Sequence, residues 1–147
     1  MKNIDHKIIN FSQNAFIPFA RFTIFIIFFW FGILKVLGFS PANPLVEALL
    51  QQTLPFLTFQ QFIVAFGLFE MLIGISFLIP MFTRVTIALL AFHMVTTFMP
   101  LILLPQVTWQ QFLVPTLEGQ YIIKNFALIA TAIGIASQLK PFKSTQE

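Results

Sequence analysis

The stretch Phe66-Gly67-Leu68-Phe69-Glu70-Met71-Leu72-Ile73-Gly74-Ile75 places one carboxylate in the middle of an apolar run. With its flanking residues, the run is long enough for a helix to cross a bilayer, which takes about 20 apolar residues. A charge at that depth costs about 2.5–3.5 kcal/mol on insertion scales, so we expect Glu70 to face a partner or water inside a bundle. Gly67, Glu70 and Gly74 share one helix face, on which glycines allow a second helix to approach closely.

The composition of the whole chain also indicates a membrane protein. Of its 147 residues, 58% are hydrophobic, 9% are charged and 21 are Phe, whereas a soluble domain carries about 25% charged residues. Because the chain has no cysteine, disulfides, thiolate metal sites and cysteine nucleophiles are excluded. The net charge of +3 does not indicate nucleic-acid binding, since the basic residues lie near the predicted helix ends. The chain is therefore predicted to be all-α, with one membrane domain over residues 1–147.

Four apolar runs predict a four-transmembrane-helix bundle, with spans at about 15–37, 59–79, 85–104 and 121–139. The first run is longer than the core of a signal peptide and is interpreted as a retained span. An even number of spans puts both termini on one side, and that side carries most of the basic residues. The positive-inside rule then predicts cytoplasmic termini in a multi-pass membrane protein. The basic residues on that side are Lys2, Lys7, Arg84, Lys140 and Lys143.

Three stretches outside the spans carry structural signals of their own. Residues 4–11 predict a short interfacial helix, and residues 43–51 predict an amphipathic helix, begun by Asn43 and Pro44, that lies on the membrane or covers the bundle. Residues 108–114 repeat the pattern of residues 58–64, and both stretches are interpreted as capped helix starts.

Glu70 and His93 are predicted to lie at similar depth. The turn after the second span is short, and Glu70 lies about as far before it as His93 lies after it. His93 shares a helix face with Thr97, so Glu70 and His93 are expected to pair directly, or through water or a ligand. Two interpretations stay open: a structural hydrogen bond between two helices, or a ligand-binding or proton-handling site.

The first span carries two basic residues, Arg21 and Lys35, on the same helix face as Gly32. Each could extend to the lipid headgroups or face the bundle. Lys35 is grouped with a second polar cluster, predicted toward the outer face, in which a lysine pairs with Glu118 or receives an anionic or quinone-like headgroup. The other members of that cluster are Lys124, Asn125, Gln120, Tyr121 and Glu47.

Small residues predict how the helices pack. Gly32, Gly67, Gly74 and Gly134 are the expected points of close approach. In the fourth span, a packing face is predicted from the small residues Ala127, Ala130, Thr131, Gly134 and Ser137. Metal binding is not predicted, because one intramembrane His with one Glu falls short of a usual ligand set.

An ordered set of motifs resembles the DoxX-like integral membrane protein family, and is closest to its YkgB/RclC-type branch. The set is Arg21…Phe28-Phe29-Trp30-Phe31-Gly32-Ile33-Leu34-Lys35, then Gly67-x-x-Glu70-x-x-x-Gly74, Pro80…Arg84 and Gly119-x-Tyr121-x-x-Lys124-Asn125. The resemblance implies a four-helix bundle in the bacterial inner membrane. It also implies an association with redox or oxidative-stress proteins, since some members are subunits of a thiosulfate:quinone oxidoreductase.

Three functions follow as hypotheses. The first is a redox-associated accessory protein that binds a quinone near Glu70 and His93, with Lys35 and Lys124 holding the ligand. The second is a transporter or channel for a small solute or proton, which requires an oligomer because four spans are few. The third is a non-catalytic scaffold or assembly factor for other membrane proteins. No residue is assigned a catalytic role, and enzymatic activity stays open.

Overall fold

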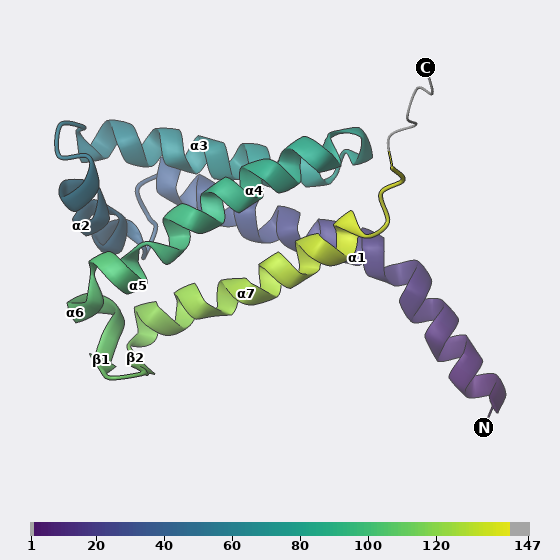
Figure 1. The fold of residues 1–147 in the computed structure, drawn as a ribbon. Coiled ribbons are helices and arrows are strands. Elements are labelled where there is room, and N and C mark those ends of the chain that lie inside the picture. The colour runs from purple at the N-terminus through teal and green to yellow at the C-terminus, as the bar shows by residue number, and fades with distance from the viewer. Residues whose placement is uncertain (1, 142–147) are drawn as a thin grey trace, which may run out of the picture.

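A computed structural model describes residues 2–141, with side chains from residue 4 onward. Lys143 and the side chain of Lys2, both used to predict topology, lie outside this part. The chain is a helical bundle in which four helices are long and apolar enough to cross a membrane (Figure 1). They are α1 (Lys2–Val36), α3 (Phe59–Phe77), α4 (Thr83–Phe98) continued by α5 (Pro100–Leu103), and α7 (Leu117–Ala136). The predicted four-helix membrane bundle is thus confirmed.

The four helices form a closed ring. α1 packs against α3 and α7, and α4 packs against the same two helices. The start of α1, the end of α7 and the α3–α4 turn lie together at one end, which we call the terminal end (Figure 1). The opposite end, which we call the loop end, carries the connections. These are α2 (Asn43–Thr53), α6 (Pro105–Thr108), β1 (Trp109–Gln111) and β2 (Val114–Pro115).

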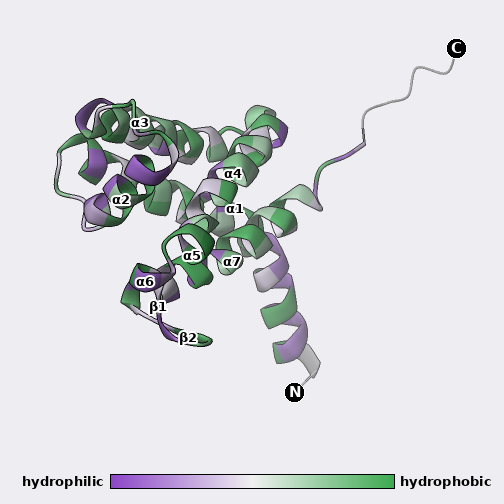
Figure 2. Ribbon diagram, turned by 60° about the vertical axis from the view of Figure 1, so that its left-hand side comes forward, coloured by the Kyte–Doolittle hydropathy of each residue, from purple (hydrophilic) through white to green (hydrophobic). Residues whose placement is uncertain are grey.

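α1 is longer than the bilayer requires. Its 35 residues extend for about 52 Å, whereas about 20 residues cross the hydrocarbon core. The predicted break between an interfacial helix and a span from residue 15 is wrong, because the helix runs through both. Pro18 lies inside α1, and the first turns lean away from the bundle axis (Figure 1). Figure 2 shows that hydrophilic and hydrophobic residues alternate along these turns.

The α3–α4 hairpin follows the prediction closely. α3 ends at Phe77, and the short 3-10 helix η1 (Pro80–Phe82) leads directly into α4. The guanidinium of Arg84 donates to the carbonyl of Lys140, which ties this turn to the chain after α7. The predicted third span is divided at Met99, because Pro100 has no N–H to continue the hydrogen-bond ladder of α4.

The loop end contains one confirmed and one wrong prediction. α2 forms as an amphipathic helix and buries Leu50, although its N-cap is Ala42 and not Asn43. Residues 108–114 do not begin a helix, although they repeat the pattern of residues 58–64. They form an antiparallel β1–β2 hairpin, in which the indole N–H of Trp109 donates to the carbonyl of Leu101 at 2.9 Å. The fourth span begins after this hairpin at Leu117, four residues earlier than predicted, and ends at Ala136.

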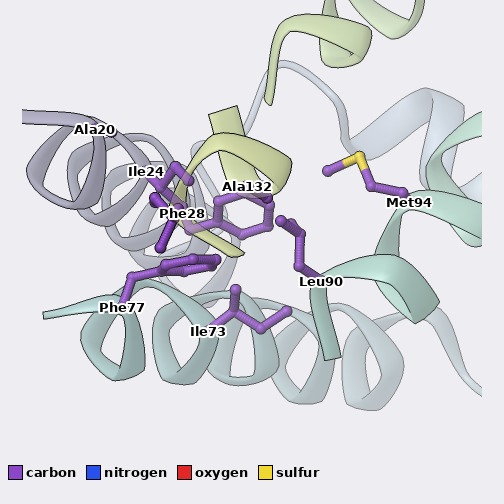
Figure 3. Packing of buried hydrophobic residues seen from close by; sticks show 9 residues of the cluster. Ala20, Ile24, Phe28, Ile73, Phe77, Leu90, Met94 and Ala132 are labelled. Atoms are coloured by element: carbon purple, nitrogen blue, oxygen red, sulfur yellow. The ribbon is translucent and has the colours of Figure 1, made fainter. Parts of the chain in front are cut away.

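A continuous apolar core joins the four spans on the terminal side of the bundle. Figure 3 shows aliphatic and aromatic side chains from all four long helices meeting around Phe28 and Phe77. Large apolar side chains also cover the outside of the helices, where a soluble protein would carry charges. The buried members of the core are Ala20, Ile24, Phe28, Ile73, Phe77, Leu90, Met94, Ala132 and Ile135.

Glycines set the close contact between α1 and α3. A Cβ at Gly32 would lie 2.6 Å from the carbonyl oxygen of Gly67, and a Cβ at Gly67 would lie 2.6 Å from that of Gly32. Gly74 faces the α1 backbone in the same way, at 3.0 Å from the nitrogen of Phe29. These predicted packing positions are confirmed, and they fix the depth of α1 against α3.

The packing face predicted for α7 is wrong. Ala127, Ala130 and Ser137 are exposed, and the buried face is carried by Ile122, Ala132 and Ile135 together with Gly119. Gly134 does meet α1, where a Cβ would lie 2.8 Å from the ring end of Phe16. α7 thus packs through these buried residues, while large apolar side chains such as Phe126 and Ile133 point outward.

Candidate functional site

Three ionisable side chains from three helices meet inside the bundle. Lys35 of α1 lies with its Nζ 2.6 Å from Oε2 of Glu70 on α3, and His93 of α4 lies with its Nε2 3.0 Å from Oε1 of the same carboxylate. We call these residues the triad. Their side chains are only 6–7% exposed. The predicted depth match of Glu70 and His93 is confirmed, and their contact is direct.

The antiparallel packing of α1 and α3 explains why Lys35 turns inward. Lys35 lies one turn beyond Gly32 toward the loop end, and Glu70 lies one turn beyond Gly67 toward the terminal end. Helical side chains lean toward the N-terminus of their own helix. Since the two helices run in opposite directions, the two side chains lean toward each other along the bundle axis. Of the two open interpretations of Lys35, the one in which it faces the bundle is therefore correct.

Aromatic rings surround the triad. The His93 imidazole stacks on Phe66 with ring centroids 5.2 Å apart and meets the edge of Phe28 at 5.1 Å. Phe69 lies at 6.2 Å, and the ammonium of Lys35 lies 5.6 Å from the centroid of Phe66. These rings exclude water, which strengthens the electrostatic interaction between Lys35 and Glu70. They also form flat apolar walls next to a polar centre.

Thr97 extends the triad toward the loop end. Its hydroxyl oxygen lies 3.1 Å from Nδ1 of His93 and 2.9 Å from the His93 carbonyl oxygen. A continuous chain of hydrogen bonds thus runs from Lys35 through Glu70 and His93 to Thr97. In this arrangement each ring nitrogen of His93 has a neighbour that can give or take a proton.

Arg21 does not contact the triad and forms its hydrogen bonds near the α3–α4 turn. Its guanidinium donates to the carbonyl of Phe77 at 2.9 Å and to the hydroxyl of Thr83 at 2.8 Å. It thereby binds the last turn of α3 and the first residue of α4 to α1. Arg21 faces the bundle, as Lys35 does, but at the terminal end.

The predicted outer cluster does not include Lys35, whose partner is Glu70 and not Glu118. Lys124 is exposed, and its ammonium lies 4.9 Å from the ring centroid of Tyr121. The amide of Asn125 donates to the carbonyls of Tyr121 and Ile122 at 3.0 and 3.1 Å. The remaining members Glu47, Glu118 and Gln120 are exposed. Asn125 is thus engaged with the backbone of its own helix.

Two open hollows lie away from the triad. One, of about 370 Å³, lies beneath the β1–β2 hairpin, and the other, of about 540 Å³, lies between α1 and the end of α7. Neither is lined by a triad residue. Among residues 2–141, no three His, Cys, Asp or Glu side chains gather to hold a metal ion. The first hollow is lined by Pro105, Trp109, Gln111, Phe112 and Leu113, and the second by Ser12, Gln13, Phe16, Ile17 and Gln138.

Comparison with known proteins adds no relative: no protein-family model, no curated protein and no solved structure matches the chain. The geometry of the triad therefore carries the functional argument.

The Lys35–Glu70 contact was missed in the sequence, although a signal for it was present. Gly32 precedes Lys35 by three residues, and Gly67 precedes Glu70 by three residues. If the two glycines mark the crossing of antiparallel helices, the charged residues lie on either side of that crossing and lean toward it. This repeated spacing would have paired Lys35 with Glu70.

Proposed function

We propose that this chain is a DoxX-like protein of the bacterial inner membrane that supports a quinone-linked redox partner, in the context of redox metabolism or oxidative stress. The observation that carries this proposal is the Glu70 carboxylate, held between Lys35 and His93 inside the membrane-spanning bundle. An intramembrane ionisable residue is by default a candidate for a ligand site or a proton relay. The ordered motifs of the four spans supply the family resemblance.

The triad suits the headgroup of a quinone. A quinone accepts hydrogen bonds at its carbonyl oxygens and takes up two protons when a partner supplies two electrons. Lys35 carries three N–H donors, of which Glu70 occupies one, so its ammonium has donors for such an oxygen. Glu70 and His93 can hold and release a proton beside it. The rings of Phe28, Phe66 and Phe69 match a flat apolar ligand.

In this proposal the two electrons come from a partner protein. The chain has no cysteine for an iron–sulfur cluster and no cluster of metal ligands among the described residues. The chemistry assigned to this chain is therefore binding and proton exchange. Because the triad side chains are only 6–7% exposed, a headgroup would reach them after one of the surrounding rings moves.

The orientation in the membrane is part of the proposal. The terminal end carries Lys7, Arg84 and Lys140, whereas Lys124 and two acidic residues lie toward the loop end. With the basic end in the cytoplasm, the loop end faces away from the cytoplasm, and Glu70 and His93 lie near the middle of their spans.

The test is to purify the protein in mild detergent and to quantify by mass spectrometry the quinones and proteins that come with it. We expect one quinone per site in wild type and in the control Lys124→Met, and a loss of at least tenfold in Glu70→Gln and Lys35→Met. Equal retention by all four proteins would locate the quinone elsewhere. Complete absence of quinone, even after incubation with an excess of a short-chain ubiquinone, would exclude the proposal.

A second candidate function is a non-catalytic membrane scaffold. The observation that favours it is that both carboxylate oxygens of Glu70 already contact Lys35 or His93, and that the side chain is almost fully buried from solvent. A protein partner that stays bound to Glu70→Gln, with no quinone in any sample, would support the scaffold. If neither a ligand nor a partner is found, proton or solute flux in proteoliposomes tests the remaining alternative, an oligomeric transporter.

A further inference from the structure

The Thr97 hydroxyl lies between two acceptor positions and has one proton to give. Its oxygen is 2.9 Å from the backbone carbonyl oxygen of His93 and 3.1 Å from Nδ1 of the His93 ring. The two distances alone do not separate the alternatives, because a threonine in a helix often donates to the carbonyl four residues before it. The other hydrogen-bond donors to the His93 carbonyl show which of the two acceptors receives the Thr97 proton.

The His93 carbonyl is already satisfied. It has two lone pairs. α4 continues through Thr97, so the helix ladder supplies the backbone N–H of Thr97 to this oxygen. The hydroxyl of Thr96 donates to the same oxygen at 2.8 Å. With both lone pairs used, the proton of the Thr97 hydroxyl is left for Nδ1.

We infer that Thr97 fixes the tautomer of His93, with the ring proton on Nε2 and the lone pair on Nδ1. The Nε2–H then donates to Oε1 of Glu70 at 3.0 Å, while Lys35 donates to Oε2 at 2.6 Å. Both carboxylate oxygens of Glu70 and both ring nitrogens of His93 have a partner in this arrangement. A second proton on the ring would bring two donors together at Nδ1 and the Thr97 hydroxyl.

The charges around His93 favour the same tautomer. The groups that face its ring are the ammonium of Lys35 beyond Glu70, the carboxylate of Glu70, and the phenyl rings of Phe28, Phe66 and Phe69. With a neutral imidazole, one ammonium and one carboxylate give the triad a net charge of zero. Because a carboxylate oxygen only accepts hydrogen bonds, the ring nitrogen that faces Glu70 is the one that carries the proton.

Thr97 is therefore a positioning residue that acts through His93. It presents the Nε2–H as a donor to Glu70, or to a ligand oxygen that takes the place of Glu70. The assignment rests on the geometry of α4 and does not require that a quinone binds. It can accordingly stand or fail independently of the proposed function.

Nitrogen NMR of the ring tests the assignment. The chain has two histidines, so a His6→Gln background leaves His93 as the only labelled ring when the protein carries ¹⁵N-histidine. The two nitrogens of a neutral imidazole differ strongly in chemical shift, and only the protonated one shows a one-bond N–H coupling. At neutral pH in detergent micelles, we expect a protonated Nε2 and an unprotonated Nδ1.

Three variants complete the experiment. Thr97→Val removes the donor to Nδ1, and we expect about a tenfold shift of the tautomer ratio toward Nδ1–H, which is what one buried hydrogen bond contributes. Thr97→Ser keeps the hydroxyl and is expected to restore the wild-type spectrum. Thr96→Val frees one lone pair of the His93 carbonyl, so an intermediate shift is expected. A ring protonated at Nδ1 in wild type, or a spectrum unchanged by Thr97→Val, would overturn the inference.

Discussion

The ammonium of Lys35 lies 2.6 Å from the carboxylate of Glu70, although their backbones lie on opposite sides of the Gly32–Gly67 crossing. The two side chains bridge that distance because each leans toward the N-terminus of its own helix. This contact joins α1 to α3 at the point where His93 of α4 also arrives. Lys35 and Glu70 can pair only because the backbones of α1 and α3 approach each other closely at Gly32 and Gly67.

The first prediction concerns this pair. Removing one partner of a buried ion pair costs about 3–5 kcal/mol, because the other charge stays buried without compensation. Glu70→Leu leaves Lys35 without a counter-charge and is expected to show the full loss. Lys35→Met is expected to lose less, since His93 still contacts Glu70. Unfolding in mixed detergent–SDS micelles measures both, with exposed Lys124→Met as the control.

The corresponding double variant tests the coupling. Lys35→Met combined with Glu70→Leu replaces both charges by apolar side chains of similar size, so the double variant should be more stable than Glu70→Leu alone. It should stay below wild type, because the Nε2–H of His93 has lost its acceptor on Glu70. Additive losses in the double variant would contradict a direct interaction between the two charges.

The second prediction concerns the helix crossing. Gly67→Ala places a Cβ 2.6 Å from the backbone oxygen of Gly32, which cannot move without separating the helices. We expect a loss of about 1–3 kcal/mol from this overpacking. Gly134→Ala is the matched control, because its Cβ meets only the ring end of Phe16, which can rotate away. An equal effect of the two variants on the unfolding midpoint would argue against a backbone contact at Gly67.

The third prediction concerns Arg21. Arg21→Met keeps the apolar stem but removes the donors to the Phe77 carbonyl and the Thr83 hydroxyl. A hydrogen bond from a charged group contributes about 1.5–3 kcal/mol, so a loss of that size is expected. Thermal unfolding in detergent, followed by tryptophan fluorescence, measures the change against the control Lys7→Met. An unchanged melting temperature would mean that Arg21 gains no more from the protein than from headgroups and water.

The fourth prediction concerns the tip of the β1–β2 hairpin. Leu113 has a φ angle of 60°, in the left-handed region that costs a branched side chain about 1–2 kcal/mol. Asn tolerates this conformation better, so Leu113→Asn should raise the melting temperature. Phe112→Asn, at the neighbouring exposed position, removes a similar apolar side chain without relieving strain and serves as the control. A fall in melting temperature equal to that of the control would show that the Leu113 side chain contributes more than its backbone strain costs.

The sequence was sufficient to predict the features that depend on nearby residues or on side-chain size alone. Long apolar runs predict helices in a bilayer, and the short turn at Pro80 fixes the relative depth of Glu70 and His93, which the structure confirms. The glycines of α1 and α3 predict a close contact, because a helix without side chains on one face admits another backbone. By contrast, the motif shared by residues 58–64 and 108–114 was misleading. The same local pattern begins α3 at residues 58–64 but forms a hairpin before α7 at residues 108–114.

The sequence by itself thus determined a four-helix membrane protein with a carboxylate and an imidazole at one depth. Only the tertiary structure decided which charge compensates Glu70. Lys35 could reach headgroups, Glu118 or the bundle interior, and these alternatives differ in the direction of one flexible side chain. The antiparallel crossing at Gly32 and Gly67 settled that direction, since it placed the ammonium 2.6 Å from the carboxylate of Glu70. The spacing of Gly32 to Lys35 and of Gly67 to Glu70 predicts this pair only once the two glycines are known to cross each other, and that crossing is a property of the tertiary structure.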